Sequence, residues 1–173
     1  EEDMNTYGNK VFEELDFKFV DSPQNSDVSI YYDTEIEIQG NRNILGLAIP
    51  KAQVNDGWEI IINSPEFNNY NHSNEYRRYA LIHELGHVLG LEHPFDNTDD
   101  DVFDGITNPQ ISLYPEDTVM AYRKPLKGIW PQSYSDNDLN ALFSIWGAEN
   151  DPIRKAYDFS NKNNAGEIVS EWF

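Results

Sequence analysis

The chain has 173 residues, which is long enough for one domain with a hydrophobic core. It has no cysteine, which excludes disulfides, a thiolate nucleophile and a cysteine-based zinc knuckle. Its 31 acidic and 12 basic residues give a formal net charge of −19, which repels nucleic acid phosphates and anionic membrane surfaces. Because of this charge, we do not expect a nucleic acid partner. No apolar run is long enough to cross a bilayer, so we do not expect a membrane span either.

The first half of the chain has the pattern of one helix followed by strands. Apolar residues recur at helical spacing over 4–15, which predicts a helix that ends near Leu15. Four segments with alternating or continuous apolar residues are strand candidates, and turn-forming residues separate them: 16–20, 28–32, 44–50 and 58–63. This order of elements predicts mixed α and β structure.

The second half begins with a long helix and contains a shorter one near its end. Ser73 or Asn74 can cap a helix that continues to Gly90, where a glycine supplies the left-handed turn that ends it. The stretch 93–134 is rich in Asp, Asn, Pro and Gly, which predicts loops. A last helix is expected over 135–147, where a capping box of Ser135 and Asp138 precedes one apolar stripe: Leu139, Leu142, Phe143 and Trp146.

Three of the four histidines lie in the single segment HELGHVLGLEH at 83–93. His83 and His87 are one helical turn apart, so their imidazoles leave the same face and can converge on one ion. Gly90 lets the backbone double back, which allows His93 to approach as a third nitrogen ligand. Three neutral nitrogens with one open position are the ligand set of a catalytic zinc, whereas a structural zinc is closed by four protein ligands. The segment therefore predicts a catalytic Zn²⁺ site.

The spacing H-E-x-x-H-x-x-G-x-x-H from His83 to His93 resembles the zinc motif of the metzincin metallopeptidases. A lone H-E-x-x-H arises by chance in helices, but five fixed positions do so far less often. The segment TVMAY at 118–122 resembles the methionine turn of the same clan. This resemblance implies that Met120 lies beneath the metal without binding it, although an ordinary core methionine would have the same properties.

Two further positions are similar to the serralysin group of metzincins. Pro94 directly follows the third histidine, where astacins usually have glutamate and matrixins usually have serine. Tyr122 follows the methionine by two positions, as it does in serralysins and astacins. The resemblance implies that Tyr122 is a labile metal ligand or an oxyanion donor, with a merely buried tyrosine as the alternative. Serralysins typically continue into a calcium-binding roll of nonapeptide repeats, and 149–173 has none, which leaves either a trimmed catalytic domain or a compact relative.

The resemblance also implies an α+β fold of the metzincin type. We expect a twisted mixed sheet of five strands with the zinc helix below it, and then a small, loop-rich subdomain that ends in a helix. A single catalytic domain is expected over 1–173, with 1–90 as its upper subdomain and 91–173 as its lower subdomain and tail. Serralysins and matrixins share an upper edge strand, and a substrate would lie extended and antiparallel to it on Leu45, Gly46, Leu47 and Ala48.

The function implied by the resemblance is that of a zinc-dependent endopeptidase with protein or peptide substrates. Glu84 would act as the general base on a water that zinc activates, and Tyr122 would help to hold the oxyanion. Two other classes stay open: a catalytically silent, zinc-containing module that binds peptides or partners, and a non-peptidase zinc hydrolase. Glu84 separates enzyme from silent module, because a silent module is expected to have lost its base. By resemblance we expect a secreted monomer, compatible with a removable propeptide or a separate inhibitor.

Three weaker features have simpler explanations. The acidic segment 96–105 gathers oxygen atoms but lacks the spacing of an EF-hand, so a solvated loop is expected, with a calcium site that no motif supports as the alternative. His72 precedes the long helix and is expected to be a solvated loop histidine. Arg123 and Lys124 follow the methionine turn where metzincins form the wall of the primary specificity pocket, and two charges on a loop weakly favour an acidic substrate side chain there.

Overall fold

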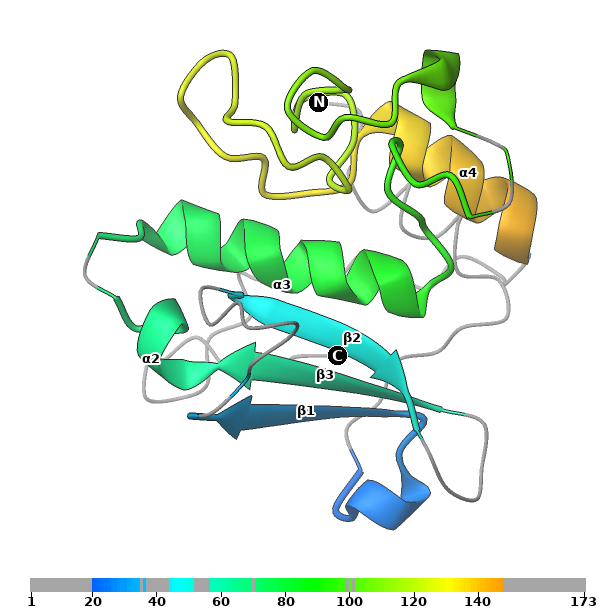
Figure 1. Cartoon of the computed structure of the whole chain (residues 1–173). Helices are drawn as coiled ribbons and strands as arrows, with labels where there is room; N and C mark the ends of the chain where they lie inside the picture. Colours follow the sequence, from blue (N-terminus) through cyan, green and yellow to red (C-terminus); the bar gives the residue numbers. More distant parts are fainter. Residues whose placement is uncertain are drawn as a thin grey trace, which may run out of the picture.

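The structure is a computed structural model that describes residues 20–34, 36, 44–51, 57–69, 71–98, 100 and 102–147 (Figure 1). Its regular elements are strands β1 (Val28–Asp33), β2 (Gly46–Pro50) and β3 (Trp58–Asn63), helices α2 (Ser64–Phe67), α3 (Asn74–Val88) and α4 (Asp136–Trp146), and the 3-10 turns η1 (Pro23–Asn25) and η2 (Phe103–Gly105). The helix predicted over 4–15 and most of the strand predicted over 16–20 lie outside the described residues.

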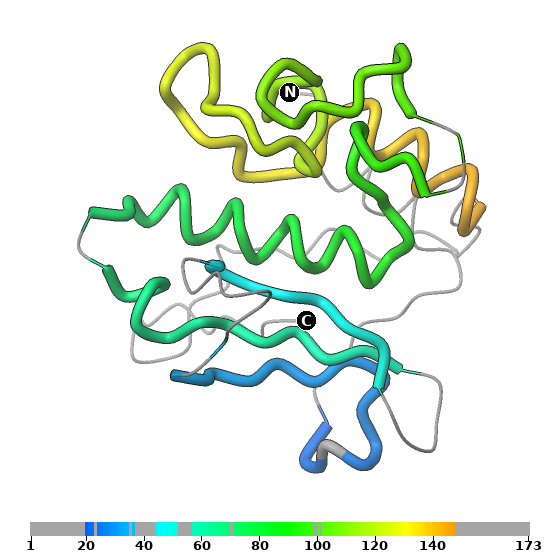
Figure 2. The backbone as a smooth tube through the Cα atoms, in the orientation of Figure 1, coloured from blue at the N-terminus to red at the C-terminus, as the bar shows by residue number. Residues whose placement is uncertain are grey.

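The three described strands form one mixed sheet in the order β1-β3-β2. β1 runs parallel to β3, with Val28 opposite Trp58, and β2 runs antiparallel to β3, with Gly46 opposite Ile62. The three strands and the mixed character of the sheet were predicted, whereas the described residues contain three strands rather than five. Figure 2 shows α3 lying along this sheet, with the loop-rich part and α4 on the other side of the helix.

Helix α3 begins and ends at the residues that the sequence indicates. The Ser73 side chain accepts a hydrogen bond of 3.2 Å from the Tyr76 N–H at the first turn. At the other end Gly90 has a φ of 96°, and the Leu91 N–H donates to the Gly86 carbonyl over 2.9 Å. This backbone closure turns the chain back along the helix, which directs the segment after Gly90 toward the helix face that carries the histidines.

Helix α4 starts with the predicted capping box and packs on a cluster of buried apolar residues, the main core cluster, whose members are given below. Leu142 is fully buried there, with Leu139 and Trp146 packed against the cluster. The predicted stripe was wrong for Phe143, which is 44% exposed, because only one narrow face of the helix meets the core. The core cluster joins α3, the loops and α4 through its buried members Tyr79, Leu89, Leu91, Val119, Met120 and Leu142.

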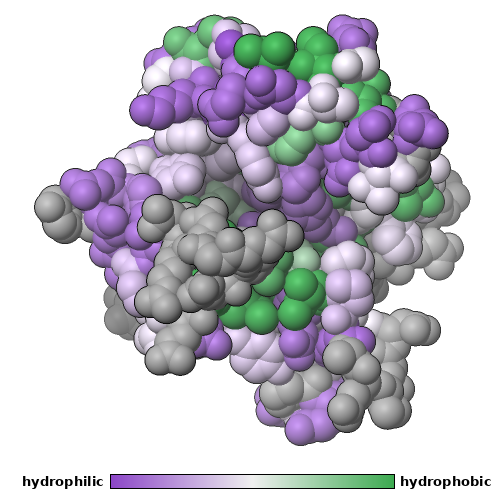
Figure 3. Space-filling view, viewed as in Figure 1, coloured by the Kyte–Doolittle hydropathy of each residue, from purple (hydrophilic) through white to green (hydrophobic). Residues whose placement is uncertain are grey.

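The loops predicted over 93–134 are confirmed for the described residues of that range, apart from the short turn η2. Several of their large apolar side chains are exposed: Phe103, Ile111, Leu126 and Ile129. Figure 3 shows hydrophobic residues, in green, on the upper surface of the molecule. No helix among the described residues is long and apolar enough to cross a membrane.

Helix α2 was not anticipated, and it changes the surroundings of His72. The Nε2 atom of His72 lies 2.8 Å from the Glu66 Oε1 atom, and its ring centroid lies 4.8 Å from that of Tyr76. His72 therefore lies in a loop before α3, as expected, but its half-buried ring packs against Glu66 and Tyr76 instead of being free in solvent. A helix of four residues has too little periodicity to be recognised, and it is this helix that carries Glu66.

Candidate metal centre

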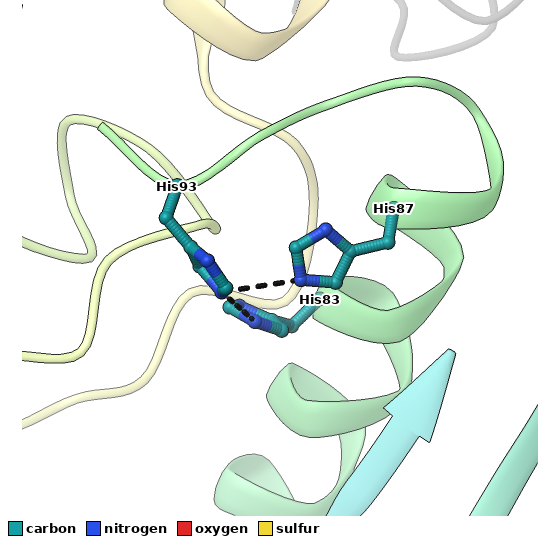
Figure 4. A group of neighbouring side chains, drawn as sticks. All are labelled: His83, His87 and His93. Carbon is teal, nitrogen blue, oxygen red and sulfur yellow. Dashed lines mark hydrogen bonds between the residues drawn. The ribbon is translucent and has the colours of Figure 1, made fainter. Parts of the chain in front are cut away.

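Helix α3 and the loop that follows it bring the three histidines of the motif together (Figure 4). The His93 Nε2 atom lies 3.1 Å from that of His87 and 3.3 Å from that of His83. Nitrogen ligands of a tetrahedral zinc, at a bond length of about 2.05 Å, are about 3.3 Å apart. The cluster therefore fits a zinc site, and it is the one such group found among the residues that the structure describes.

Backbone carbonyls orient the two helical histidines. The His83 Nδ1 atom lies 2.7 Å from the Val119 carbonyl oxygen, and the His87 Nδ1 atom lies 3.0 Å from that of Leu91. A carbonyl can only accept, so each Nδ1 carries the proton and each Nε2 presents a lone pair. A proton on the His93 Nε2 atom can be donated to the Nε2 atom of either His83 or His87, but not to both at once. One cation, by contrast, can bind all three Nε2 atoms.

Burial keeps the three imidazoles neutral. It lowers the pKa of His83 to about 3 and the pKa of His93 to about 4, and it also lowers the pKa of His87. The nearby imidazoles lower the pKa of His83 and His93 further. Since histidine binds metal in its neutral form, the rings are in the state that a metal requires at neutral pH.

Glu84 is buried between the helix and strand β2. The Ala48 N–H donates a hydrogen bond to its carboxylate, and burial raises the pKa of Glu84 to about 7. A Cβ atom at Gly46 would lie 2.9 Å from the Glu84 Cγ atom, so glycine leaves the space that this side chain fills. A carboxyl group whose pKa is near neutrality is able both to accept and to release a proton at that pH.

Strand β2 contains three of the four residues expected to bind substrate, and the fourth directly precedes it. All four are half-buried, and β2 is an edge strand of the described sheet: Leu45, Gly46, Leu47 and Ala48. Two of them, Gly46 and Ala48, also contact Glu84. The sequence alone does not reveal this contact, because it joins residues of separate elements.

Tyr122 and Met120 occupy different environments. The Tyr122 ring is 52% exposed and its centroid lies 4.7 Å from that of His93 and 5.6 Å from that of His83. This exposure does not match a merely buried tyrosine. Met120 is 1% exposed and packs on α3, where a Cβ atom at Gly86 would lie 2.7 Å from its sulfur. Its role beneath a metal stays a prediction.

Asp138 links α4 to the turn that orients His83. Its Oδ1 atom accepts a hydrogen bond of 2.5 Å from Thr118 Oγ1, and its Oδ2 atom accepts from the N–H groups of Val119 and Ser135 at 2.9 and 2.8 Å. The side chain is 3% exposed. The capping box identified Asp138 as part of a helix start, but nothing local in the sequence indicates its bonds to Thr118 and Val119.

We expect Asp138→Ala to lower the free energy of unfolding by about 3 kcal/mol or more, since a hydrogen bond to a charged group contributes about 1.5–3 kcal/mol and buried donors would lose their acceptor. Denaturant unfolding measures this change. Asp136→Ala, which removes an exposed carboxylate from the same helix turn, is the control. Equal unfolding midpoints for the two variants would contradict the proposed link.

The structure also describes most of the acidic segment 96–105, and Arg123, the two other loop features noted in the sequence. Asp100 and Asp104 are exposed, in keeping with a solvated loop over 96–105. The Arg123 guanidinium stacks over the Tyr114 ring, 3.4 Å from its centroid, and donates to the Ser112 carbonyl over 2.9 Å. These contacts occupy Arg123 inside the loop and weaken the expectation that it binds an acidic substrate side chain.

Comparisons with known proteins agree with the resemblance of the histidine motif. The chain is 38% identical to a serralysin of Photorhabdus luminescens over 88 residues, or 44% of this chain and 18% of the relative. It is 31% identical to a serralysin of Photorhabdus laumondii subsp. laumondii over 127 residues, or 67% and 26%. It is 40% identical to the metalloprotease AprA of Pseudomonas entomophila over 48 residues, or 28% and 10%. The matches thus span only a minor part of each relative.

No family profile and no solved structure matches the chain.

Proposed function

We propose that this chain, which is related to the serralysin-like metzincins, is a zinc-dependent endopeptidase. The observation that carries the proposal is the convergence of three neutral imidazole nitrogens at α3, the helix that also carries the buried carboxyl group of Glu84. A set of three nitrogen ligands leaves one coordination position of a tetrahedral zinc ion open for water or substrate. By the same relationship we propose that the chain is a secreted, monomeric catalytic domain that acts on proteins or peptides.

In this proposal His83, His87 and His93 hold one Zn²⁺ ion through their Nε2 atoms. Zinc, when bound, supplies a Lewis acid that polarises the scissile carbonyl and lowers the pKa of water to about 7. The Glu84 carboxylate takes a proton from the attacking water and then delivers it to the leaving nitrogen. The Tyr122 hydroxyl donates a hydrogen bond to the oxyanion of the tetrahedral intermediate.

Substrate binding in this proposal uses the edge strand. A peptide in extended form would lie antiparallel to β2 over Leu45–Ala48 and form main-chain hydrogen bonds with it. The Ala48 N–H already bonds the Glu84 carboxylate, so the strand and the general base are in direct contact. Main-chain recognition depends little on side chains, and we therefore propose broad cleavage specificity.

The test is cleavage of a quenched fluorescent peptide library by the full chain. One sample is stripped with a chelator and another is stripped and then given zinc back. We expect cleavage to be lost on stripping and restored by zinc, because the proposed chemistry requires the ion. Absence of cleavage by protein that is shown to hold zinc would contradict the endopeptidase proposal and favour a silent binding module.

A further inference from the structure

We propose that Phe95 is a positioning residue of the metal centre, which holds the His93 imidazole in place by ring stacking. This inference rests on the proposed zinc site. The centroids of the Phe95 and His93 rings are 4.9 Å apart and the ring planes differ by only 10°. Tyr122 packs on the same phenyl ring at 4.9 Å and 60°, and on the His93 ring at 4.7 Å and 69°. The three rings form one contiguous cluster.

His93 differs from the other two histidines in what orients it. His83 and His87 stand on α3, and each ring is fixed by a hydrogen bond from Nδ1 to a backbone carbonyl. His93 lies on a loop, and within the described residues its ring makes hydrogen-bond contacts only through Nε2, toward the other two imidazoles. Metal-binding histidines normally have an outer partner that sets the ring plane. The stacked phenyl ring supplies that constraint for His93 by packing.

The backbone places Phe95 over His93 independently of the phenyl ring. The Asp96 N–H donates to the His93 carbonyl over 3.0 Å, which closes a turn with Pro94 at its second position. The Phe103 N–H donates to the Pro94 carbonyl over 3.0 Å and ties the turn to η2. Because both bonds are between backbone atoms, a substitution at Phe95 removes the ring and leaves the turn in place.

Loss of the ring is expected to affect the affinity for zinc more than the fold. Phe95 is half-buried and is not a member of the main core cluster, so its removal costs little packing there. The His93 ring, however, would gain rotational freedom that zinc binding must then remove. Substitution of such outer partners typically weakens metal binding by about 10-fold to 100-fold. For Phe95→Ala we expect a loss of about tenfold.

The test measures zinc affinity by competition with a chromophoric chelator, together with the visible absorption spectrum of the cobalt-substituted protein. We expect Phe95→Ala to bind zinc about tenfold more weakly and to change the cobalt bands, which report ligand geometry. Phe95→Tyr keeps the stacked ring and is expected to restore both. Phe95→Leu keeps much of the volume without the ring, so it is expected to bind weakly as well and serves if the alanine variant does not fold.

Phe67→Ala is the matched control. It removes a half-buried phenylalanine of α2 that packs edge-on with Tyr32 at 6.0 Å, and it is expected to leave zinc affinity unchanged. Wild-type affinity in both Phe95→Ala and Phe95→Leu, a loss that Phe95→Tyr does not restore, or an equal loss in Phe67→Ala would each overturn the role of Phe95. Failure of the unaltered chain to bind zinc would instead refute the proposed metal site.

Discussion

Replacement of Glu84 by glutamine is expected to lower kcat/KM for peptide cleavage by about 1,000-fold while zinc stays bound. Glutamine has nearly the shape of glutamate, and its amide oxygen can still accept the hydrogen bond from the Ala48 N–H. It cannot take a proton from water or return one to the leaving nitrogen. The variant therefore separates the chemical role of the carboxyl group from its packing against Gly46.

Zinc content and peptide cleavage must be measured on the same preparation of Glu84→Gln. Glu75→Gln is a suitable control, because Glu75 lies on the same helix but is exposed and outside the metal centre. We expect the control variant to keep wild-type turnover. If Glu84→Gln with a full complement of zinc cleaved peptides at a rate near that of the unaltered chain, Glu84 would not be the general base.

The elements that the sequence predicted correctly are those with local signals. The side chain of Ser73 caps α3, Gly90 ends it in the left-handed region, and Ser135 with Asp138 starts α4. Each of these depends on residues within one or two helical turns, so the chain itself contains the information. The convergence of His83 and His87 follows from helical spacing in the same way.

The contacts that the sequence did not predict join segments far apart in the chain. The Gly46 backbone meets the side chain of Glu84, and the Asp138 carboxylate binds the turn that contains Val119. No periodicity or motif encodes such pairs, because they exist only once the sheet, α3 and the loops have packed. Phe95 is intermediate: its stack on His93 spans two residues, yet it depends on how the turn at Pro94 folds.

The burial of the three histidines of the candidate metal centre is the reason to expect that zinc also stabilises the fold. The three imidazoles are neutral and largely withdrawn from water, and their Nε2 atoms face one another. Without an ion, a single proton on the His93 Nε2 atom can be donated to only one of the other two imidazoles at a time, and a polar atom withdrawn from water without a hydrogen bond destabilises the fold. A bound ion removes that cost, and binding that is confined to the folded state adds its own free energy to folding.

Zinc is therefore expected to raise the Tm of the stripped protein by about 10 °C at a concentration of about 1,000 times Kd. Binding to the native state alone then contributes about 4 kcal/mol, and each kcal/mol raises the Tm of a chain of this size by about 2–4 °C. Thermal unfolding of stripped protein with increasing zinc measures the shift. In His93→Ala the shift is expected to fall by most of its size, because one of three ligands is gone.

His72→Ala is the matched control for this titration. It removes the one histidine of the chain that lies outside the proposed zinc site, and this histidine contacts Glu66 instead. The comparison is made within each variant, with and without zinc, so any difference in the stability of the metal-free proteins cancels. We expect His72→Ala to keep the full zinc-dependent rise in Tm. A rise of the same size in His93→Ala would mean that zinc stabilises the chain from some other place, and that the three converging nitrogens are not its site.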